Sequence, residues 1–585
     1  MYCGDETGSF IGDVGSHTSR FGYGGEDNPK YVVPSYMSSL TENAEEKHFI
    51  PTSCYQGRLA SQSVQPVMRM PWLSDDTDDD TVKRLAAATP QVNPNAYLQQ
   101  GDIIQDWDAL ETLWQTSFDI LRARDTLKHT KGGTPFRSSS SPENSSSSSS
   151  SNINTTATES ARCIHPILAV TPGLTHIMGS GSGQGTKYAA AVEREQQSRL
   201  TEFLMETMEA PAMFLAPTPM LSSFCFGRQT SLVVDIGAGG CRVTPVVDGL
   251  VLKHAQRRNG RGGDWLGNVQ WRAMSEDKIV LRPRYQLRNN VSAMNTKSPY
   301  LYRWAMQDLM YEMRSSSHTS LPVWCVDETV PFMSSKTCST DSASTSGSKS
   351  SADEENNDND DVDDDNSKSA NASNGEQKEQ DEEDSGSDQA EDTMDLDDNE
   401  KSATPSTLIR GGGGRGGGES IPGNTYELPD GTCVDMSTNT GKDLCRIPEL
   451  LFTDAVPFVT ECSGPAGILR EHHTLANLPL HQLIFESLSA VGDGDIRKDL
   501  ASNILLTGGS SMFPNLEQRL SMEVPRIVPS AYKCRVVASR NAVERTCSAW
   551  VGGSVLTSLG SFQQLWLSRA EYEEYGTALS VQRFP

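Results

Sequence analysis

The sequence predicts an α/β fold, and three features of the chain lead to this prediction. Short apolar runs such as Leu232–Val234 and Ile504–Leu506 stop at polar or glycine-rich turns, as buried strands do. Segments with the apolar spacing of helices lie between such runs. Three glycine-containing loops each follow a strand-like run, and this alternation of strand, loop and helix is typical of α/β proteins.

Charge is distributed unevenly along the 585 residues. The formal net charge is −27, but residues 351–400 alone hold 22 acidic and two basic residues. The rest of the chain carries 55 acids against 48 bases, a net of −7. The overall balance therefore does not indicate a basic surface for nucleic acids.

The sequence does not support several classes of protein. Its twelve cysteines form no C-x-x-C pair and no cluster with histidines, so a structural zinc site is not expected. Residues 1–10 carry acids and glycines where a secretory signal needs a basic start and an apolar run. No stretch has the roughly 20 apolar residues that a membrane span requires. We therefore expect an intracellular protein with reduced cysteines and no membrane partner.

Two long segments have the composition of disordered inserts. Residues 125–160 are basic and then serine-rich, and residues 335–420 combine the acidic tract with a glycine-rich run after Arg410. Such segments cannot bury enough apolar area to offset the entropy of ordering. The two predicted domains are therefore assigned to the remaining ranges, 1–124, 161–334 and 421–585.

Three helices can be placed from their apolar faces and their first residues. Asp106 would cap a helix whose buried face includes Trp107 and Phe118. A second helical face runs through Leu200–Met208, and Pro514 is placed as the first-turn proline of a third helix.

The three glycine loops have a form suited to phosphate binding. They lie within Phe10–Arg20, Val233–Gly239 and Leu506–Ser511. Glycine lets backbone N–H groups approach phosphate oxygens closely, a hydroxyl such as Ser16 adds a donor, and Arg20 offsets negative charge.

Two of these loops also carry a carboxylate. Asp13 and Asp235 would hold hydrated Mg²⁺, a metal that takes few protein carboxylates and keeps several waters. A single Asp-x-Gly after a strand is more often only a tight turn. Two such loops, together with a Gly-Gly loop after a third strand, favour two similar halves that clasp a nucleotide.

At this point the sequence resembles the actin superfamily, and the resemblance covers nearly all of the chain outside the inserts. The resemblance implies a two-lobed ATPase fold built from duplicated ribonuclease-H-like domains, with ATP and Mg²⁺ in the cleft. The motifs that carry it are Asp13–Ser16, Arg20–Pro29, His165–Leu168, Pro211–Met213, Tyr426–Gly431, Asp495–Leu500, Leu506–Pro514 and Trp550–Trp566.

The resemblance also implies which residues bind the nucleotide. Asp13 and Asp235 are the expected metal ligands. Arg545 and Thr546, and Glu312 and Arg314, fall in segments that correspond to adenosine contacts, but the match there is too poor to assign them. The expected nucleotide contacts are Gly15, Ser16, His17, Arg20, Gly237, Ala238, Gly239, Gly508, Gly509, Ser510, Met512 and Phe513.

Within the superfamily, the chain most resembles the actin-related protein 4 family. That family is nuclear, and its members sit beside an actin monomer on a helical segment of a chromatin-remodelling ATPase or of an acetyltransferase scaffold. The resemblance therefore implies a nuclear protein with actin as a partner. It rests on Met1–Gly8, Gly25–Asp27, Asp102–Asp108, Val543–Arg545 and Glu571–Glu574.

Departures from actin fall on residues that would position the attacking water. Thr218 occupies the place of a glutamine, Arg242 that of a histidine, and Ala238 that of the second aspartate of the loop. Because hydrolysis depends mostly on positioning and charge stabilisation, we expect ATP to be retained with negligible turnover. Residual turnover assisted by Arg242 is the open alternative.

Partner binding and filament formation are expected to differ from actin as well. Residues 42–95 lack a recognisable filament-contact loop, so a homopolymer is not expected. Phe224, Leu556, Leu559 and Leu565 correspond to the apolar cleft in which actins accept partner helices.

The acidic tract leaves two interpretations open. It could attract basic histone tails or nucleosomes, or it could serve as a solubilising spacer, and the spacer is the commoner role of such tracts. Two other functions compete with the main one. A cytoskeletal relative would polymerise and hydrolyse ATP, and a sugar kinase or chaperone ATPase would lack the motif at Trp550–Trp566.

Overall fold

The chain divides into two units, and the described residues all belong to the first of them. The first unit is Met1–Cys338 with Ser420–Pro585, and the second is Ser339–Glu419. The predicted insert at 335–420 lies outside the described residues, as does most of the one at 125–160. The computed structural model describes residues 8–42, 45–49, 63–66, 103–132, 165–171, 183–289, 299–315, 425–436, 438, 441, 444–453 and 478–584.

Two large sheets form the framework, and they share a local pattern. In the first, β1 pairs antiparallel with β2 and parallel with β7; in the second, β9 pairs antiparallel with β10 and parallel with β15. This repetition of one arrangement is what a duplicated α/β fold predicts. The first sheet has the order β17 (Leu567–Ser568), β8 (Ala212–Pro217), β7 (Ile167–Thr171), β1 (Phe10–Val14), β2 (Thr18–Tyr23) and β3 (Tyr31–Pro34). The second has the order β11 (Leu250–Val251), β10 (Cys241–Val247), β9 (Ser231–Ile236), β15 (Ile504–Thr507) and β16 (Val536–Ala538), with β12 (Arg257–Asn259) paired to β10.

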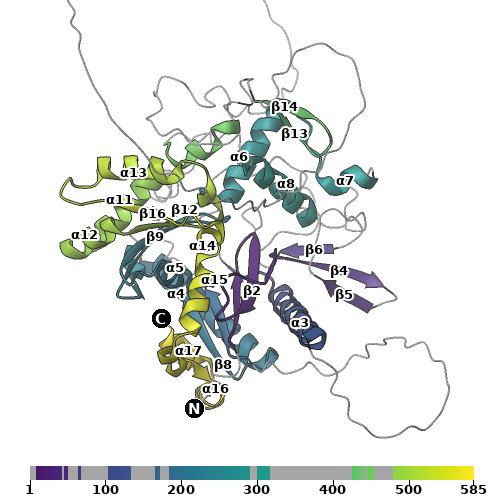
Figure 1. Ribbon diagram of the computed structural model, residues 1–585, viewed down its shortest axis with the longest axis vertical. Coiled ribbons are helices and arrows are strands. Elements are labelled where there is room, and N and C mark those ends of the chain that lie inside the picture. The colour runs from purple at the N-terminus through teal and green to yellow at the C-terminus, as the bar shows by residue number, and fades with distance from the viewer. Residues whose placement is uncertain are drawn as a thin grey trace, which may run out of the picture. The chain divides into compact units, whose positions relative to one another are not determined.

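Helices α5 (Thr218–Cys225) and α15 (Ser548–Thr557) pack against each other and connect the two sheets (Figure 1). Ser222 and Ser548 share a hydrogen bond of 2.9 Å between their hydroxyls. The indole nitrogen of Trp550 lies 3.4 Å from the carbonyl oxygen of Ile11, to which it donates. The buried cluster around Trp550 therefore joins α15 to the strand that carries the first glycine loop.

The outer face of the first sheet is covered by aromatic packing. Phe10 contacts the rings of Phe21, Trp114 and Phe118, which joins β1 and β2 to α3 (Trp107–Gly132). Aromatic pairs of this kind add stability beyond the area that they bury. The same core is completed by α4 (Gly183–Glu202), the π-helix Phe203–Thr207, α16 (Arg569–Tyr575) and α17 (Thr577–Arg583).

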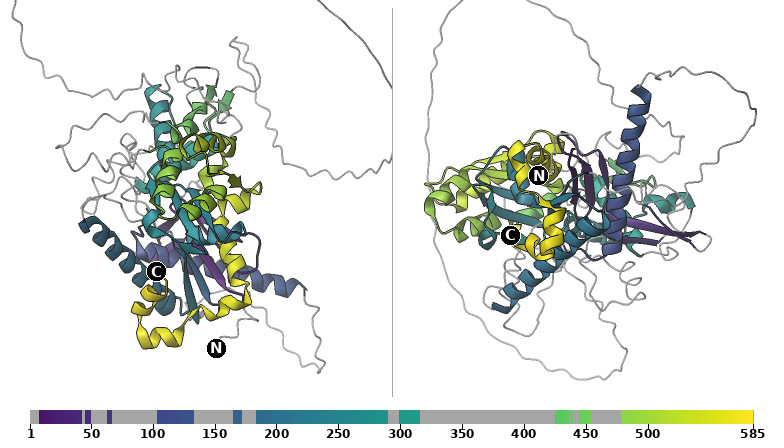
Figure 2. Two further views of the ribbon diagram at one scale, coloured as in Figure 1. Left: turned by 90° about the vertical axis from the view of Figure 1, so that its left-hand side faces the viewer. Right: turned by 90° about the horizontal axis from the view of Figure 1, so that it is seen from below.

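The second sheet and its surroundings are covered by a separate set of elements. Met313 of α8 packs in one buried cluster with Leu428, next to β13, and with Val434 of β14. Figures 1 and 2 show β13 and β14 at the opposite end of this unit from α16 and α17. The elements are α6 (Gly263–Glu276), α7 (Arg284–Asn289), α8 (Pro299–Arg314), β13 (Thr425–Glu427), β14 (Cys433–Asp435), α11 (Leu480–Ala490), α12 (Gly494–Ser502), α13 (Leu516–Ile527) and α14 (Ala542–Thr546), with the 3₁₀ turns Lys253–Ala255, Ile447–Leu451 and Gly509–Met512. The 3₁₀ turn Gly560–Gln564 lies instead with the first sheet, where Phe562 packs against Phe214 of β8. A small sheet of β4 (Tyr36–Glu42), β5 (Glu45–Phe49) and β6 (Ser63–Pro66) follows β3.

Several predicted elements are confirmed, and two boundaries differ. The Asp106 carboxylate accepts from the backbone N–H of Ala109 at 2.9 Å, as expected of a cap. The helix after it continues to Gly132, eight residues into the range predicted as an insert, and ends where the sequence has two consecutive glycines. The helix after Pro514 begins only at Leu516, since Asn515 has a left-handed φ of 64°.

No described helix has the length and apolarity to cross a membrane. Within the same residues, no group of three or more His, Cys, Asp or Glu side chains is arranged to hold a metal ion.

Candidate functional site

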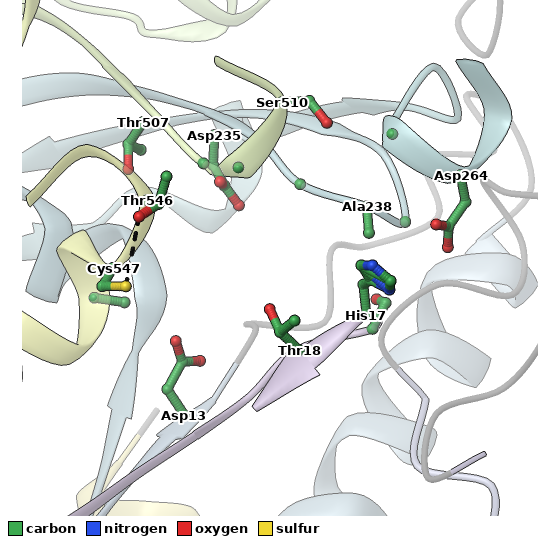
Figure 3. A pocket seen from close by; sticks show the side chains of 18 of the residues that line it. Asp13, His17, Thr18, Asp235, Ala238, Asp264, Thr507, Ser510, Thr546 and Cys547 are labelled. Carbon is green, nitrogen blue, oxygen red and sulfur yellow. Dashed lines mark hydrogen bonds between the residues drawn. The ribbon is translucent and has the colours of Figure 1, made fainter. Parts of the chain in front are cut away.

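A cavity of about 390 Å³ lies where the glycine loops of the two sheets meet. Figure 3 shows Asp13 and Asp235 on different sides of this space, with both carboxylates directed into it. Its volume lies in the range of small-molecule sites. The lining comprises Asp13–Thr18, Arg20, Val32, Thr218, Asp235, Gly237–Gly240, Arg242, Gly263, Asp264, Gln307, Asp308, Tyr311, Arg314, Thr507–Ser510 and Thr546–Ala549.

The first loop is the tight turn between β1 and β2. The N–H of Gly15 donates to the carbonyl of Thr18 at 3.2 Å, which closes the turn. Asp13 and Arg20 are cross-strand partners, and Arg20 Nη1 lies 3.1 Å from Asp13 Oδ2. Burial lowers the pKa of the Arg20 guanidinium, but Asp13 and Cys547 outweigh it and the pKa is raised. This arginine therefore stays charged inside the cavity.

The second loop is held by the first residues of α6. The N–H groups of Gly263 and Asp264 donate to the carbonyls of Gly237 and Ala238 at 2.9 and 3.0 Å. A Cβ on Gly239 would lie 2.9 Å from the hydroxyl oxygen of Ser16, on the facing loop. Only glycine allows the two loops to approach this closely.

The third loop closes against Asp235. Gly508 has a φ of 97°, and a Cβ there would lie 2.5 Å from Asp235 Oδ1. Glycine is therefore required at this position both by backbone conformation and by space. The N–H of Gly508 is held at 3.0 Å by the carbonyl of Arg545, at the end of α14.

Two of the predicted contacts do not line this cavity. The short 3₁₀ turn Gly509–Met512 carries Met512 to the surface, where it is 39% exposed. Phe513 turns into the hydrophobic core of the second sheet and is 8% exposed. The other predicted site residues, including both aspartates, all lie on the lining.

The glycine loops and carboxylates fit a nucleotide with its metal ion. Asp13 and Asp235 would hold Mg²⁺ through bound water, since oxygen ligands are the ones Mg²⁺ prefers. The close approach at Gly239 leaves backbone and hydroxyl donors, with no side chain between them, where phosphate groups would bind. When bound, Mg²⁺ would neutralise phosphate charge.

One wall of the cavity was not predicted. This wall is one face of α8. It carries Gln307 and the residues one, four and seven positions after it, which are Asp308, Tyr311 and Arg314. The signal for this wall in the sequence was the resemblance, which placed Arg314 in a segment that corresponds to an adenosine contact; helical spacing alone does not show which cavity these residues face. Asp264 lies nearby on the first turn of α6.

Two charged groups on this wall, Arg314 and Asp308, have shifted pKa values. Burial lowers the pKa of the Arg314 guanidinium to about 10, although Asp264 and Tyr311 act to raise it. Burial likewise raises the pKa of the Asp308 carboxyl, against the lowering effect of His17 and Arg284. The ring of His17 lies 6.0 Å from that of Tyr311, measured between centroids. This end of the cavity is thus less hydrated than an open surface.

The segment that begins α15 completes the cavity. Thr546 and Cys547 line it, with 3.5 Å between the hydroxyl oxygen and the sulfur (Figure 3). The Arg545 side chain is instead engaged with Ser511, where its Nε donates to the hydroxyl at 3.0 Å. Of the four unassigned residues, Thr546 and Arg314 therefore reach the cavity, and Arg545 and Glu312 do not line it.

Thr218, Arg242 and Ala238 were expected to replace the water-positioning residues of actin, and the structure shows what surrounds each of them. The Thr218 hydroxyl donates to the carbonyl of Thr171 at 3.0 Å. Arg242 of β10 lies directly opposite Asp235 of β9 in the antiparallel register. Ala238 offers no polar side-chain atom. At these three positions the cavity therefore has a hydroxyl that already donates to the backbone, one arginine and one methyl group.

With this fold and cavity established, comparison with known proteins defines the class. The model of the actin family matches residues 4–585, and the chain belongs to that family. It is similar to actin-related protein 4 of Oryza sativa subsp. indica, 26% identical with both chains fully covered, and of Arabidopsis thaliana, 25% identical with both fully covered. Actin-related protein 4 of Saccharomyces cerevisiae is 23% identical over 98% of this chain and 96% of its own length.

The apolar residues expected to accept a partner helix differ in exposure. Leu559 and Leu565 are 49% and 53% exposed, and neighbouring Val555 is 47% exposed. Leu556 is buried in the core beside Trp550, and Phe224 is partly buried against the same core. These three exposed residues lie near the C-terminal end of α15 and in the segment that follows it.

Proposed function

We propose that this actin-family protein binds ATP as a structural ligand, does not hydrolyse it appreciably, and serves as a subunit of nuclear chromatin-remodelling and histone acetyltransferase complexes. Bound nucleotide would stabilise the closed fold by mass action. Asp13 and Asp235 would hold Mg²⁺, and the three glycine loops would hold the phosphates.

The observation that carries the proposal is the hydrogen bond from Thr218 to Thr171. The bond uses the only hydrogen of the hydroxyl, and the side chain is shorter than the glutamine found there in actins. Because removal of groups that position the reacting atoms costs orders of magnitude in rate, slow or absent turnover is expected.

The proposed nuclear role is supported by relatives named actin-related protein 4 along the full chain. We propose that the protein docks beside actin on a helical segment of a remodelling ATPase or an acetyltransferase scaffold. Exposed Val555, Leu559 and Leu565 supply apolar anchors of the kind that a helix in a groove requires. The protein is proposed not to form filaments of its own.

Two measurements test the proposal. Single-turnover release of phosphate from bound ATP should be much slower than in polymerising actin; a comparable rate would exclude the non-hydrolysing assignment. Affinity purification from nuclear extract should yield actin and a remodelling ATPase. Recovery in a cytoplasmic filament fraction would instead support the cytoskeletal alternative.

A role for the acidic tract in histone binding can be tested separately. Residues 351–400 lie outside the described residues. Deleting them and measuring histone affinity distinguishes the two interpretations: a weaker affinity supports histone binding, and an unchanged one supports the spacer.

A further inference from the structure

The two candidate metal-binding aspartates are each matched by an arginine, and the two pairs are built alike. Arg20 lies opposite Asp13 across the β1–β2 pair, and Arg242 lies opposite Asp235 across the β9–β10 pair. In both halves the arginine follows the aspartate by seven residues. All four residues line the nucleotide cavity.

Cross-strand partners of an antiparallel pair project from the same face of the sheet with their Cβ atoms close together. For the first pair the result is an ion pair of 3.1 Å, with side chains only 16% and 13% exposed. For the second pair, the register places Arg242 beside Asp235 on the same face of the sheet, and both residues line the cavity.

These pairs determine the net charge of the side chains that would surround a bound triphosphate. Two carboxylates alone would repel it, and a divalent cation would be needed to offset that repulsion. With Arg20 and Arg242 present, the formal charge of these four residues is zero before any metal binds. Over the whole lining, which adds Asp264, Asp308 and Arg314, it is −1 instead of −3. Arginine is also the side chain best shaped to make paired hydrogen bonds to phosphate oxygens.

A third arginine fixes the loop between these groups. Arg258 is buried, and its Nη2 donates to the carbonyl of Gly239 at 3.2 Å. Arg258 therefore holds in place the loop that would carry the phosphates.

We propose that Arg242 makes nucleotide retention at this site largely independent of a divalent cation, because it supplies the positive charge that the metal would otherwise bring. This inference rests on the proposed function, namely that the cavity binds ATP. Mg²⁺ still fits the site between Asp13 and Asp235, but its removal would leave the phosphates held by two arginines and the glycine loops.

The test uses the full chain loaded with the fluorescent nucleotide 1,N6-etheno-ATP. Its dissociation rate is measured after addition of excess ATP, once with Mg²⁺ and once with EDTA. We expect the rate of the unaltered protein to rise less than about fivefold in EDTA. Arg242→His should raise it by on the order of 10- to 100-fold more in EDTA than in Mg²⁺, the effect of losing one charge-assisted hydrogen bond to phosphate.

Two further variants control for charge and folding. Arg242→Lys keeps the cation and should largely restore metal-independent retention. Arg228→His makes the same substitution at an exposed turn outside the cavity and should behave as the unaltered protein. Thermal unfolding of each variant separates loss of binding from loss of fold.

The outcomes separate this inference from the proposed function. Loss of nucleotide from the unaltered protein at least 100-fold faster in EDTA would overturn the inference and leave ATP binding intact. Equal effects of Arg242→His in EDTA and in Mg²⁺ would overturn it as well. Failure to retain nucleotide even with Mg²⁺ would overturn the proposed function, and the inference with it.

Discussion

The hydroxyl of Thr218, the first residue of α5, donates a hydrogen bond of 3.0 Å to the carbonyl of Thr171, the last residue of β7. The bond ties the edge of the candidate nucleotide cavity to the first sheet. A side chain committed in this way has no second hydrogen to offer a water molecule.

Restoring the actin-like side chains should therefore restore hydrolysis. In the double variant Thr218→Gln and Arg242→His, we expect single-turnover phosphate release to rise by tenfold or more, the typical scale for a positioning group. Thr218→Val, which cannot donate, should stay at the low rate. No gain in the double variant would show that the slow step lies elsewhere, for instance at Ala238.

Gly508 should be irreplaceable for nucleotide binding. In Gly508→Ala, the new Cβ would lie 2.5 Å from Asp235 Oδ1 on a backbone with a φ of 97°. Asp235 must then move, so we expect tenfold or greater loss of ATP affinity in calorimetry and a lower melting temperature. Gly560→Ala, where a Cβ would meet nothing within 4 Å, should leave both unchanged. Normal ATP affinity in Gly508→Ala would contradict the role assigned to Asp235.

A buried ion cluster should dominate the stability of the second sheet's core. Arg519 lies 2.8 Å from Glu449 and 2.6 Å from Glu523, with all three side chains at most 12% exposed. Arg519→Met leaves the buried Glu449 carboxylate without its ion pair and Glu523 with only the more exposed Arg526, and should lower the free energy of unfolding by about 3–5 kcal/mol. The control Arg526→Met removes a cation that is 47% exposed and should cost no more than about 1 kcal/mol. Denaturant unfolding measures the loss of unfolding free energy in both variants. Equal losses would show that the difference in burial between Arg519 and Arg526 does not determine the cost.

Glu571 should make stability depend on pH in the acid range. A hydrogen bond from Arg583, together with one from the backbone N–H of Ser568, lowers the pKa of its carboxyl from 4.5 to about 2. A lowered pKa in the folded state adds stability above pH 4.5 that is lost as the pH falls toward 2.

The difference in melting temperature between the unaltered protein and Glu571→Gln should therefore be full at pH 7 and shrink by pH 3. Glu573→Gln, at a side chain that is 65% exposed and paired only with Arg569, should show no such change. A difference that stays constant between pH 7 and pH 3 would mean that Glu571 is not held ionised by these partners.

The glycine loops could be predicted from the sequence because their signal is local. An aspartate and glycines directly after an apolar run mark a strand end and its turn, and Asp13, Asp235 and Gly508 all line the cavity as expected. Met512 and Phe513 show the limit of a resemblance, which gives a position along the chain but not the direction of a side chain. One 3₁₀ turn decides that direction here.

The wall formed by α8 could not be placed from the sequence for a different reason. Tyr311 and Arg314 reach the cavity only because α8 packs on α6, more than thirty residues earlier in the chain. No local pattern contains such long-range packing. Likewise, the hydrogen bond from Thr218 to Thr171 depends on the pairing of β7 with β8 and cannot be read from either segment alone.

The cluster that holds Met313 beside Leu428 also bears on how this chain could be engineered. The chain leaves the described structure at residue 315 and returns at 425, and both ends are anchored in that one cluster. Because packing within this cluster keeps Met313 and Leu428 together, a reporter domain whose own termini lie close to each other could be inserted genetically between them without separating α8 from β13.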